Sequence, residues 1–135
     1  LKYDLDDHLS KGGKVLGHNI AVFDLPILRD SMDIYCIHKY LGDENYIDTS
    51  KILLKEHGER FQLKNLVKCT MNDVKLMDSA DAPKLWKMGQ YDEVVEYCMK
   101  DTQLVYDLWK YGQEHGIVKA FSIEKEEFVD LEVDW

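Results

Sequence analysis

The longest amphipathic segment, residues 91–116, limits the folds open to this chain more than any other feature. It reads YDEVVEYCMKDTQLVYDLWKYGQEHG, and its apolar residues recur at helical spacing as one stripe: Val94, Val95, Cys98, Leu104, Val105 and Leu108. Gly112 and Gly116 stand near its end, where glycine favours helix termination. We therefore predict one long helix that packs its apolar stripe against the rest of the domain.

The remaining segments predict further helices and few strands. Residues 14–19, KVLGHN, predict a short strand with Val15 and Leu16 inside and a tight turn at Gly17. Residues 22–28 predict a helix with Val22, Phe23, Ile27 and Leu28 on its apolar face. Pro26 does not exclude this helix, because proline is tolerated in a first turn. Other predicted elements are an acidic helix ending at residues 12–13, a strand or turn at 46–48, helices at 49–57 and 63–67, a loop at 71–83, a short helix from residue 81 or 82, and an edge strand at 128–135.

Length predicts one domain over residues 1–135, and the pattern of elements makes it a helix-rich α/β domain. The cysteine usage indicates a cytoplasmic protein. No apolar run approaches the length of a membrane span, and the polar start has no signal-peptide pattern. Cys36, Cys69 and Cys98 are far apart and form no CxxC pair, so we expect reduced, buried thiols and no zinc site. The net charge of −9 argues against general nucleic-acid coating, but not against an acidic site that meets nucleic acid through divalent cations.

Two polar pairs can carry chemistry. Tyr97 and Asp101 are four residues apart and so share one face of the long helix. A carboxylate there can bind Mg²⁺ or Mn²⁺, and a phenol one turn away can orient a water. The alternative is a solvated Asp101 beside a half-buried Tyr97. Asp24 can likewise be a metal ligand, or a first-turn acid of a helix that Asn19 caps.

The segments around these residues resemble one enzyme family. GHNIAVFDLPIL, at residues 17–28, resembles the second motif of the DnaQ-like (DEDD) 3′–5′ exonucleases, and EYCMKDTQLVYDLW, at residues 96–109, resembles their third motif in its tyrosine form, DEDDy. IDTSKILLKEHG and FQLKNLVKCT are similar to the predicted exonuclease domain of some DEAD/DEAH-box helicases and to YprB-like proteins. The resemblance implies a ribonuclease H-like fold, helix-rich and lacking the N-terminal strands of the family.

The resemblance also implies roles for single residues. Asp24 and Asp101 match metal-binding acids of a two-metal site for Mg²⁺ or Mn²⁺, and Tyr97 matches the tyrosine that positions the attacking water. Asn19 matches a position that shapes the strand end, and it is a candidate substrate-binding residue. The first motif, D-x-E, is absent, and Asp4, Asp6 and Asp7 stand at the wrong distance to replace it. We therefore expect a domain truncated before that motif, with half of its metal site in this chain.

The predicted function is a 3′–5′ exonuclease-type nuclease acting on single-stranded DNA or RNA ends by two-metal-ion phosphodiester hydrolysis, inactive alone if the missing motif is required. Lys64, Lys68 and Lys75 can contact the phosphate backbone, although a solvated helix face explains the first two equally well. One alternative is a non-catalytic ribonuclease H-like module that binds nucleic acid or a helicase partner, and another is a purely structural domain. The strand at residues 15–17 should have an open edge that a second copy, a missing segment or another protein covers.

Overall fold

The computed structural model describes residues 2–31, 37–42, 45–74, 78 and 80–135. The chain divides into two compact units, residues 1–60 and 61–135, and each unit is described by itself. In the described residues the protein is a mixed α/β chain, rich in helix, with two small sheets of two strands each. This confirms the predicted class, while the prediction of one domain over residues 1–135 stays a prediction.

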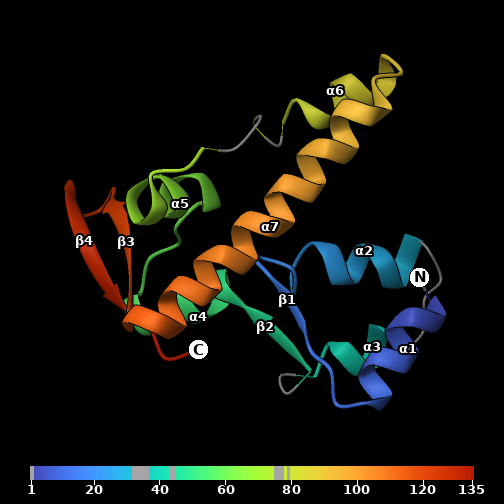
Figure 1. The fold of residues 1–135 in the computed structure, drawn as a ribbon, viewed down its shortest axis with the longest axis horizontal. Coiled ribbons are helices and arrows are strands. Elements are labelled where there is room, and N and C mark those ends of the chain that lie inside the picture. Colours follow the sequence, from blue (N-terminus) through green and yellow to red (C-terminus); the bar gives the residue numbers. More distant parts are fainter. Residues whose placement is uncertain (1, 32–36, 43–44, 75–77, 79) are drawn as a thin grey trace. The chain divides into compact units, whose positions relative to one another are not determined.

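The first unit holds a short parallel sheet between helices (Figure 1). Its elements are α1 (Lys2–Ser10), β1 (Val15–Gly17), α2 (Asp24–Ser31), α3 (Ile37–Tyr40), β2 (Tyr46–Asp48) and α4 (Thr49–His57). β1 and β2 run parallel, with Val15 opposite Tyr46 and Gly17 opposite Asp48. The strand predicted within residues 14–19 is confirmed, and residues 46–48, predicted as a strand or turn, form a strand. The helix that ends at Gly58 is also confirmed, and Gly58 has a left-handed φ of 76°.

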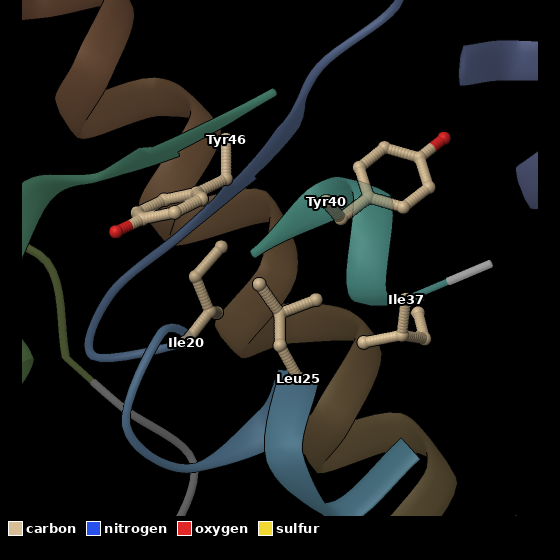
Figure 2. Packing of buried hydrophobic residues seen from close by; sticks show 5 residues of the cluster. All are labelled: Ile20, Leu25, Ile37, Tyr40 and Tyr46. Carbon is tan, nitrogen blue, oxygen red and sulfur yellow. The ribbon is translucent and has the colours of Figure 1, made fainter. Parts of the chain in front are cut away.

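In the described residues of this unit, one cluster of buried side chains, shown in Figure 2, contains Ile20, Leu25, Ile37, Tyr40 and Tyr46. They come from the turn after β1, from α2, from α3 and from β2, so they join the sheet to the helices. The Tyr40 hydroxyl donates to the carbonyl oxygen of Leu5 at 2.6 Å, which ties α1 to the same cluster. Burial of these residues is the main stabilising contribution to the unit.

The predicted apolar face over residues 22–28 is wrong in its phase. Val22, Phe23 and Ile27 are exposed, whereas Ile20 and Leu25 are buried. The reason is that a turn occupies the residues before Asp24, so helical spacing does not apply to Val22 and Phe23. Pro26 does lie in the first turn of α2, as predicted.

In its described residues, the second unit combines three helices with an antiparallel hairpin. Its elements are α5 (Leu63–Met71), α6 (Ala82–Lys87), α7 (Tyr91–His115), β3 (Ile117–Ser122) and β4 (Glu127–Glu132). α5 and the C-terminal part of α7 lie beside β3 (Figure 1), and α6 packs against α7. The long helix, the helix at residues 63–67, the short helix and the edge strand at the C-terminus are therefore confirmed, and β3 is an additional strand that the sequence reasoning did not predict.

The apolar stripe predicted for α7 is only partly buried. Leu104, Val105 and Leu108 are buried as expected, but Val95 and Cys98 are exposed. At 100° per residue, Val95 lies on nearly the opposite side of the helix from Leu104 and Leu108, so one face cannot contain all three. Buried Tyr97, 6% exposed, continues the face of Leu104 and Leu108 in its place. The expectation of a buried thiol is thus wrong for Cys98; Cys69 is a partly buried free thiol, and Cys36 lies outside the described residues.

In the part of the chain that the structure describes, β1 pairs with β2 alone in its sheet. The prediction that another segment or molecule covers the second edge of β1 stays a prediction. A search of the described helices finds none with the length and apolar character needed to cross a membrane.

Candidate functional site

The segment that carries Asp24 makes a tight reversal after β1. A Cβ atom at Gly17 would overlap the side chain of Ile20, so glycine at this position lets Ile20 fold back over the strand end. Asn19 adopts a left-handed conformation with φ of 67°, which asparagine tolerates better than most residues. Asp24 is then the first residue of α2. Because Asn19 is five positions earlier, it does not cap that helix, whereas Asp24 does stand in the first turn, as the alternative interpretation placed it.

Asp48 holds this reversal in place, and the sequence reasoning did not identify it. It is 2% exposed, and its carboxylate accepts four backbone N–H groups. Oδ1 accepts from Asn19 at 2.8 Å, from Ser50 at 3.0 Å and from Lys51 at 3.2 Å, and Oδ2 accepts from Ala21 at 3.0 Å. One side chain therefore both caps α4 and fastens the turn that leads to Asp24.

Of the two roles of Asp48, the local sequence indicates only the capping of α4. An acid directly before Thr49 and Ser50, at the start of a predicted helix, is a typical N-cap. The bonds to Asn19 and Ala21 join residues far apart in the sequence, and only the parallel pairing of β1 with β2 brings them together. The full role of Asp48 could not be read from local pattern.

Asp24 lies in surroundings that disfavour its charge. Desolvation by neighbouring protein atoms raises the pKa of Asp24, and repulsion from the Asp48 carboxylate raises it further, while a hydrogen bond to its own backbone lowers it. The side chain nevertheless stays exposed at the surface. A carboxylate that is accessible but poorly stabilised gains from a bound cation, because an opposite charge favours its ionised form.

His18 and Asn19 flank the strand end with defined contacts. His18 Nδ1 lies 2.9 Å from Thr49 Oγ1, and that hydroxyl donates to the carbonyl oxygen of Gly17 at 3.3 Å. These bonds link the end of β1 to the start of α4. The proposed contact between Asn19 and substrate is not tested by them; its backbone N–H is used by Asp48.

Tyr97 and Asp101 lie one turn apart on α7, as the spacing predicted. Tyr97 is buried, and Asp101 is partly buried with its Oδ1 atom inaccessible to solvent. The Oδ1 atom of Asp101 is thus shielded from solvent, while the side chain as a whole is still partly exposed. Helical geometry places both residues on the same face as Leu104 and Leu108, so a carboxylate stands in a largely apolar stripe. Such a placement costs free energy unless the charge is stabilised by other groups.

The candidate phosphate contacts lie elsewhere on the second unit. Lys64 extends from α5, and its Nζ donates to Asp78 Oδ1 at 3.3 Å. Both side chains are more than half exposed, so solvent screens this ion pair and leaves Lys64 accessible. Lys68 is exposed on the same helix, and Lys75 lies outside the described residues.

The predicted site residues fall into two sets, one in each unit. Asp24, with Asp48 nearby, belongs to residues 1–60, and Tyr97 and Asp101 belong to residues 61–135. Each half of the predicted site is therefore described in its own unit. Among the described residues, no group of three or more His, Cys, Asp or Glu side chains is arranged to hold a metal ion.

Comparisons with protein-family models, with curated proteins and with solved structures found no match to this chain.

Proposed function

We propose that this chain is a nuclease domain of the 3′–5′ exonuclease type, with a ribonuclease H-like fold, that acts on ends of single-stranded DNA or RNA. The observation that carries the proposal is the pair on α7: Tyr97 buried and Asp101 partly buried, one turn apart on the face of the helix that is otherwise apolar. Packing alone does not call for a carboxylate at that position. The two motifs that resemble the DEDDy exonucleases contain this pair and Asp24.

The carboxylates of the two motifs fit a divalent cation better than they fit a complete metal pair. Mg²⁺ keeps several water ligands and typically takes one or two carboxylates together with substrate phosphates. Asp24 and Asp101 would supply these carboxylates. Asp48 cannot add to them without losing the backbone bonds that engage both of its oxygens. The resemblance implies a second cation, for which ligands from the missing D-x-E motif would be needed.

Each residue then has a separate task. Bound Mg²⁺ or Mn²⁺ would stabilise the charge that develops on the phosphate oxygens. The Tyr97 hydroxyl would orient the attacking water at the terminal phosphodiester, since a phenol both donates and accepts hydrogen bonds. The net charge of −9 repels phosphate at long range, so cations are also needed for the nucleic acid to approach.

A non-catalytic module is the second candidate. It is favoured by the finding that the described residues contain no cluster of three potential metal ligands. In that case the domain would bind nucleic acid, or a helicase, through surfaces that it retained while the chemistry was lost.

Incubation with 5′-labelled single-stranded DNA and RNA in the presence of Mn²⁺ tests the first candidate. We expect shortening from the 3′ end that Asp101→Asn slows by about a hundredfold or more, because a charge-stabilising group is removed. Tyr97→Phe, which keeps the ring and removes the hydroxyl, should also slow it.

Glu96→Gln is the matched control, since Glu96 is an exposed acid on the same helix, next to Tyr97 in the sequence. It should cleave like the unmodified protein. Cleavage that persists unchanged in Asp101→Asn would refute the nuclease assignment. No cleavage by a folded chain, with nucleic acid still retained in an anisotropy assay, would instead favour the non-catalytic module.

A further inference from the structure

The two edges of the β3–β4 hairpin differ in how their backbone groups are hydrogen-bonded. The edge of β3 is closed by two side chains of α5 that behave like a neighbouring strand. The Asn65 amide donates to the carbonyl oxygen of Phe121 at 2.7 Å and accepts its N–H at 2.8 Å. The Thr70 hydroxyl donates to the carbonyl oxygen of Lys119 at 3.0 Å and accepts its N–H at 2.9 Å.

These bonds fix which residues of β4 face outward. Lys119 and Phe121 turn their backbone groups toward α5, so they form non-hydrogen-bonded pairs with the residues opposite, Asp130 and Phe128. In an antiparallel ladder both members of such a pair point their N–H and C=O groups away from each other. Asp130 and Phe128 therefore present theirs at the outer edge of β4, and Glu132 follows in the same register.

The outer edge of β4 is not closed in the way that β3 is. In the described part of the chain, β4 pairs with β3 alone. Phe128, Asp130 and Glu132 also share one face of the hairpin, and we call these three residues the β4 edge. Phe128 is 78% exposed and meets Phe121 edge-on with ring centroids 5.2 Å apart, while Asp130 and Glu132 are exposed acids.

A hollow of about 550 Å³ lies against the hairpin and is bordered on one side by Cys69 of α5; the hairpin residues that line it are Lys119, Ala120, Phe128, Val129 and Asp130. The sequence of β4 and its flanking residues is predominantly acidic. Residues 124–134 contain Glu124, Glu126, Glu127, Asp130, Glu132 and Asp134 against a single base, Lys125. Lys119, opposite Asp130, offsets part of this charge.

We propose that the β4 edge binds an extended, basic segment of a partner protein by strand addition. Exposed backbone groups on a strand edge give affinity to an added strand, and alternate side chains give specificity. Residues directly opposite each other in an antiparallel pair share a face, so bases are required opposite Glu132 and Asp130, and an apolar or aromatic residue opposite Phe128. The partner pattern is therefore Lys/Arg–x–Lys/Arg–x–Phe, running antiparallel to β4.

A second copy of this chain fits the β4 edge poorly. Antiparallel pairing of β4 with itself about its centre places Asp130 against Asp130, and a shift of one pair in one direction places Asp130 against Glu132. A shift in the other direction places each Asp130 against Phe128, so no register gives an acid of the β4 edge a base. Like charges directly opposite in a sheet are destabilising. Charge complementarity therefore selects a basic partner. This inference does not depend on the nuclease assignment, because the β4 edge contains none of its residues.

The test uses a fluorescent peptide of sequence Thr-Lys-Thr-Lys-Thr-Phe-Thr and measures its binding to the full chain by anisotropy, with ¹⁵N shifts of Phe128 and Asp130 as the structural readout. N-methylation of the lysines and phenylalanine should weaken binding by about tenfold or more, since their N–H groups face the edge. N-methylation of the intervening threonines should leave binding unchanged, because those N–H groups face away.

Asp130→Lys supplies the matching change in the protein. It should weaken binding of the lysine peptide by about tenfold or more and restore binding of Thr-Lys-Thr-Glu-Thr-Phe-Thr, in which glutamate replaces only the lysine opposite position 130, with the circular dichroism spectrum unchanged. Equal effects of the two N-methylation sets would overturn strand addition in favour of charge attraction alone. Absence of binding to the unmodified protein would also overturn the proposal and would leave the acids only the role of preventing edge-to-edge association.

Discussion

Replacement of Asp48 tests how the turn before Asp24 is held. The carboxylate makes two separable sets of bonds, one to Ser50 and Lys51 at the start of α4 and one to Asn19 and Ala21 in the turn. Loss of a helix cap costs about 1 kcal/mol. Loss of an acceptor for a backbone N–H costs about 1–3 kcal/mol, toward the lower end here because the two turn bonds are only partly buried. Asp48→Ala should therefore lower the free energy of unfolding by about 3–5 kcal/mol.

Asp48→Ser separates the two contributions. A serine hydroxyl can still cap α4, but it is too short to reach the N–H groups of Asn19 and Ala21, so it should recover only about 1 kcal/mol. Urea unfolding followed by circular dichroism gives the difference in free energy. Hydrogen exchange should become faster at Asn19 and Ala21 in both variants, and at Ser50 in the alanine variant only. Full recovery of stability by Asp48→Ser, or a loss below about 1 kcal/mol in Asp48→Ala, would show that the turn is not held by this carboxylate.

Two further predictions concern the same turn. Gly17→Ala should destabilise the protein by about 1–3 kcal/mol in urea unfolding, because the added Cβ meets the buried side chain of Ile20. Gly42→Ala is the control, and it should lower the free energy of unfolding by less, because its added Cβ would lie 3.5 Å from the nearest atom. Equal losses of stability in the two variants would contradict the reasoning. Asp24→Asn should stabilise the protein in the absence of metal, because burial and the Asp48 charge raise the pKa of Asp24 in the folded state above its unfolded value. The raised pKa means that the ionised carboxylate of Asp24 destabilises the folded state. This penalty is absent below the unfolded pKa and grows as pH rises through the folded pKa, so the gain in melting temperature of Asp24→Asn should be present at neutral pH and vanish in strong acid. A loss of stability at neutral pH would support the interpretation of Asp24 as a favourable first-turn acid.

The elements that the sequence predicted well are those with local causes. α4 lies between an acid that caps it and Gly58, which takes the left-handed conformation, and α7 has sustained helical spacing. The spacing of Tyr97 and Asp101 was enough to place them on one helical face. These features depend on residues within a turn or two of each other.

The features that were missed depend on contacts between distant residues. β3 buries Val118, Ala120 and Ser122 and exposes Phe121, so its sequence does not alternate between apolar and polar residues. Part of its ladder is completed by the Asn65 and Thr70 side chains of α5 rather than by another strand. The phase of the apolar face before α2 was wrong because the turn is imposed by Asp48, a residue on another strand. Periodicity carries no information on either arrangement.

The central claim, that Asp24 and Asp101 serve the same metal site, is tested most directly by titration of Mn²⁺ into ¹⁵N-labelled protein. Paramagnetic broadening should affect the amides around Asp24 and those around Asp101 together, and either Asp24→Asn or Asp101→Asn should abolish both sets, while Glu96→Gln should abolish neither. Broadening around Asp101 that survives in Asp24→Asn, or broadening confined to other acidic segments such as residues 4–7, would contradict a shared site.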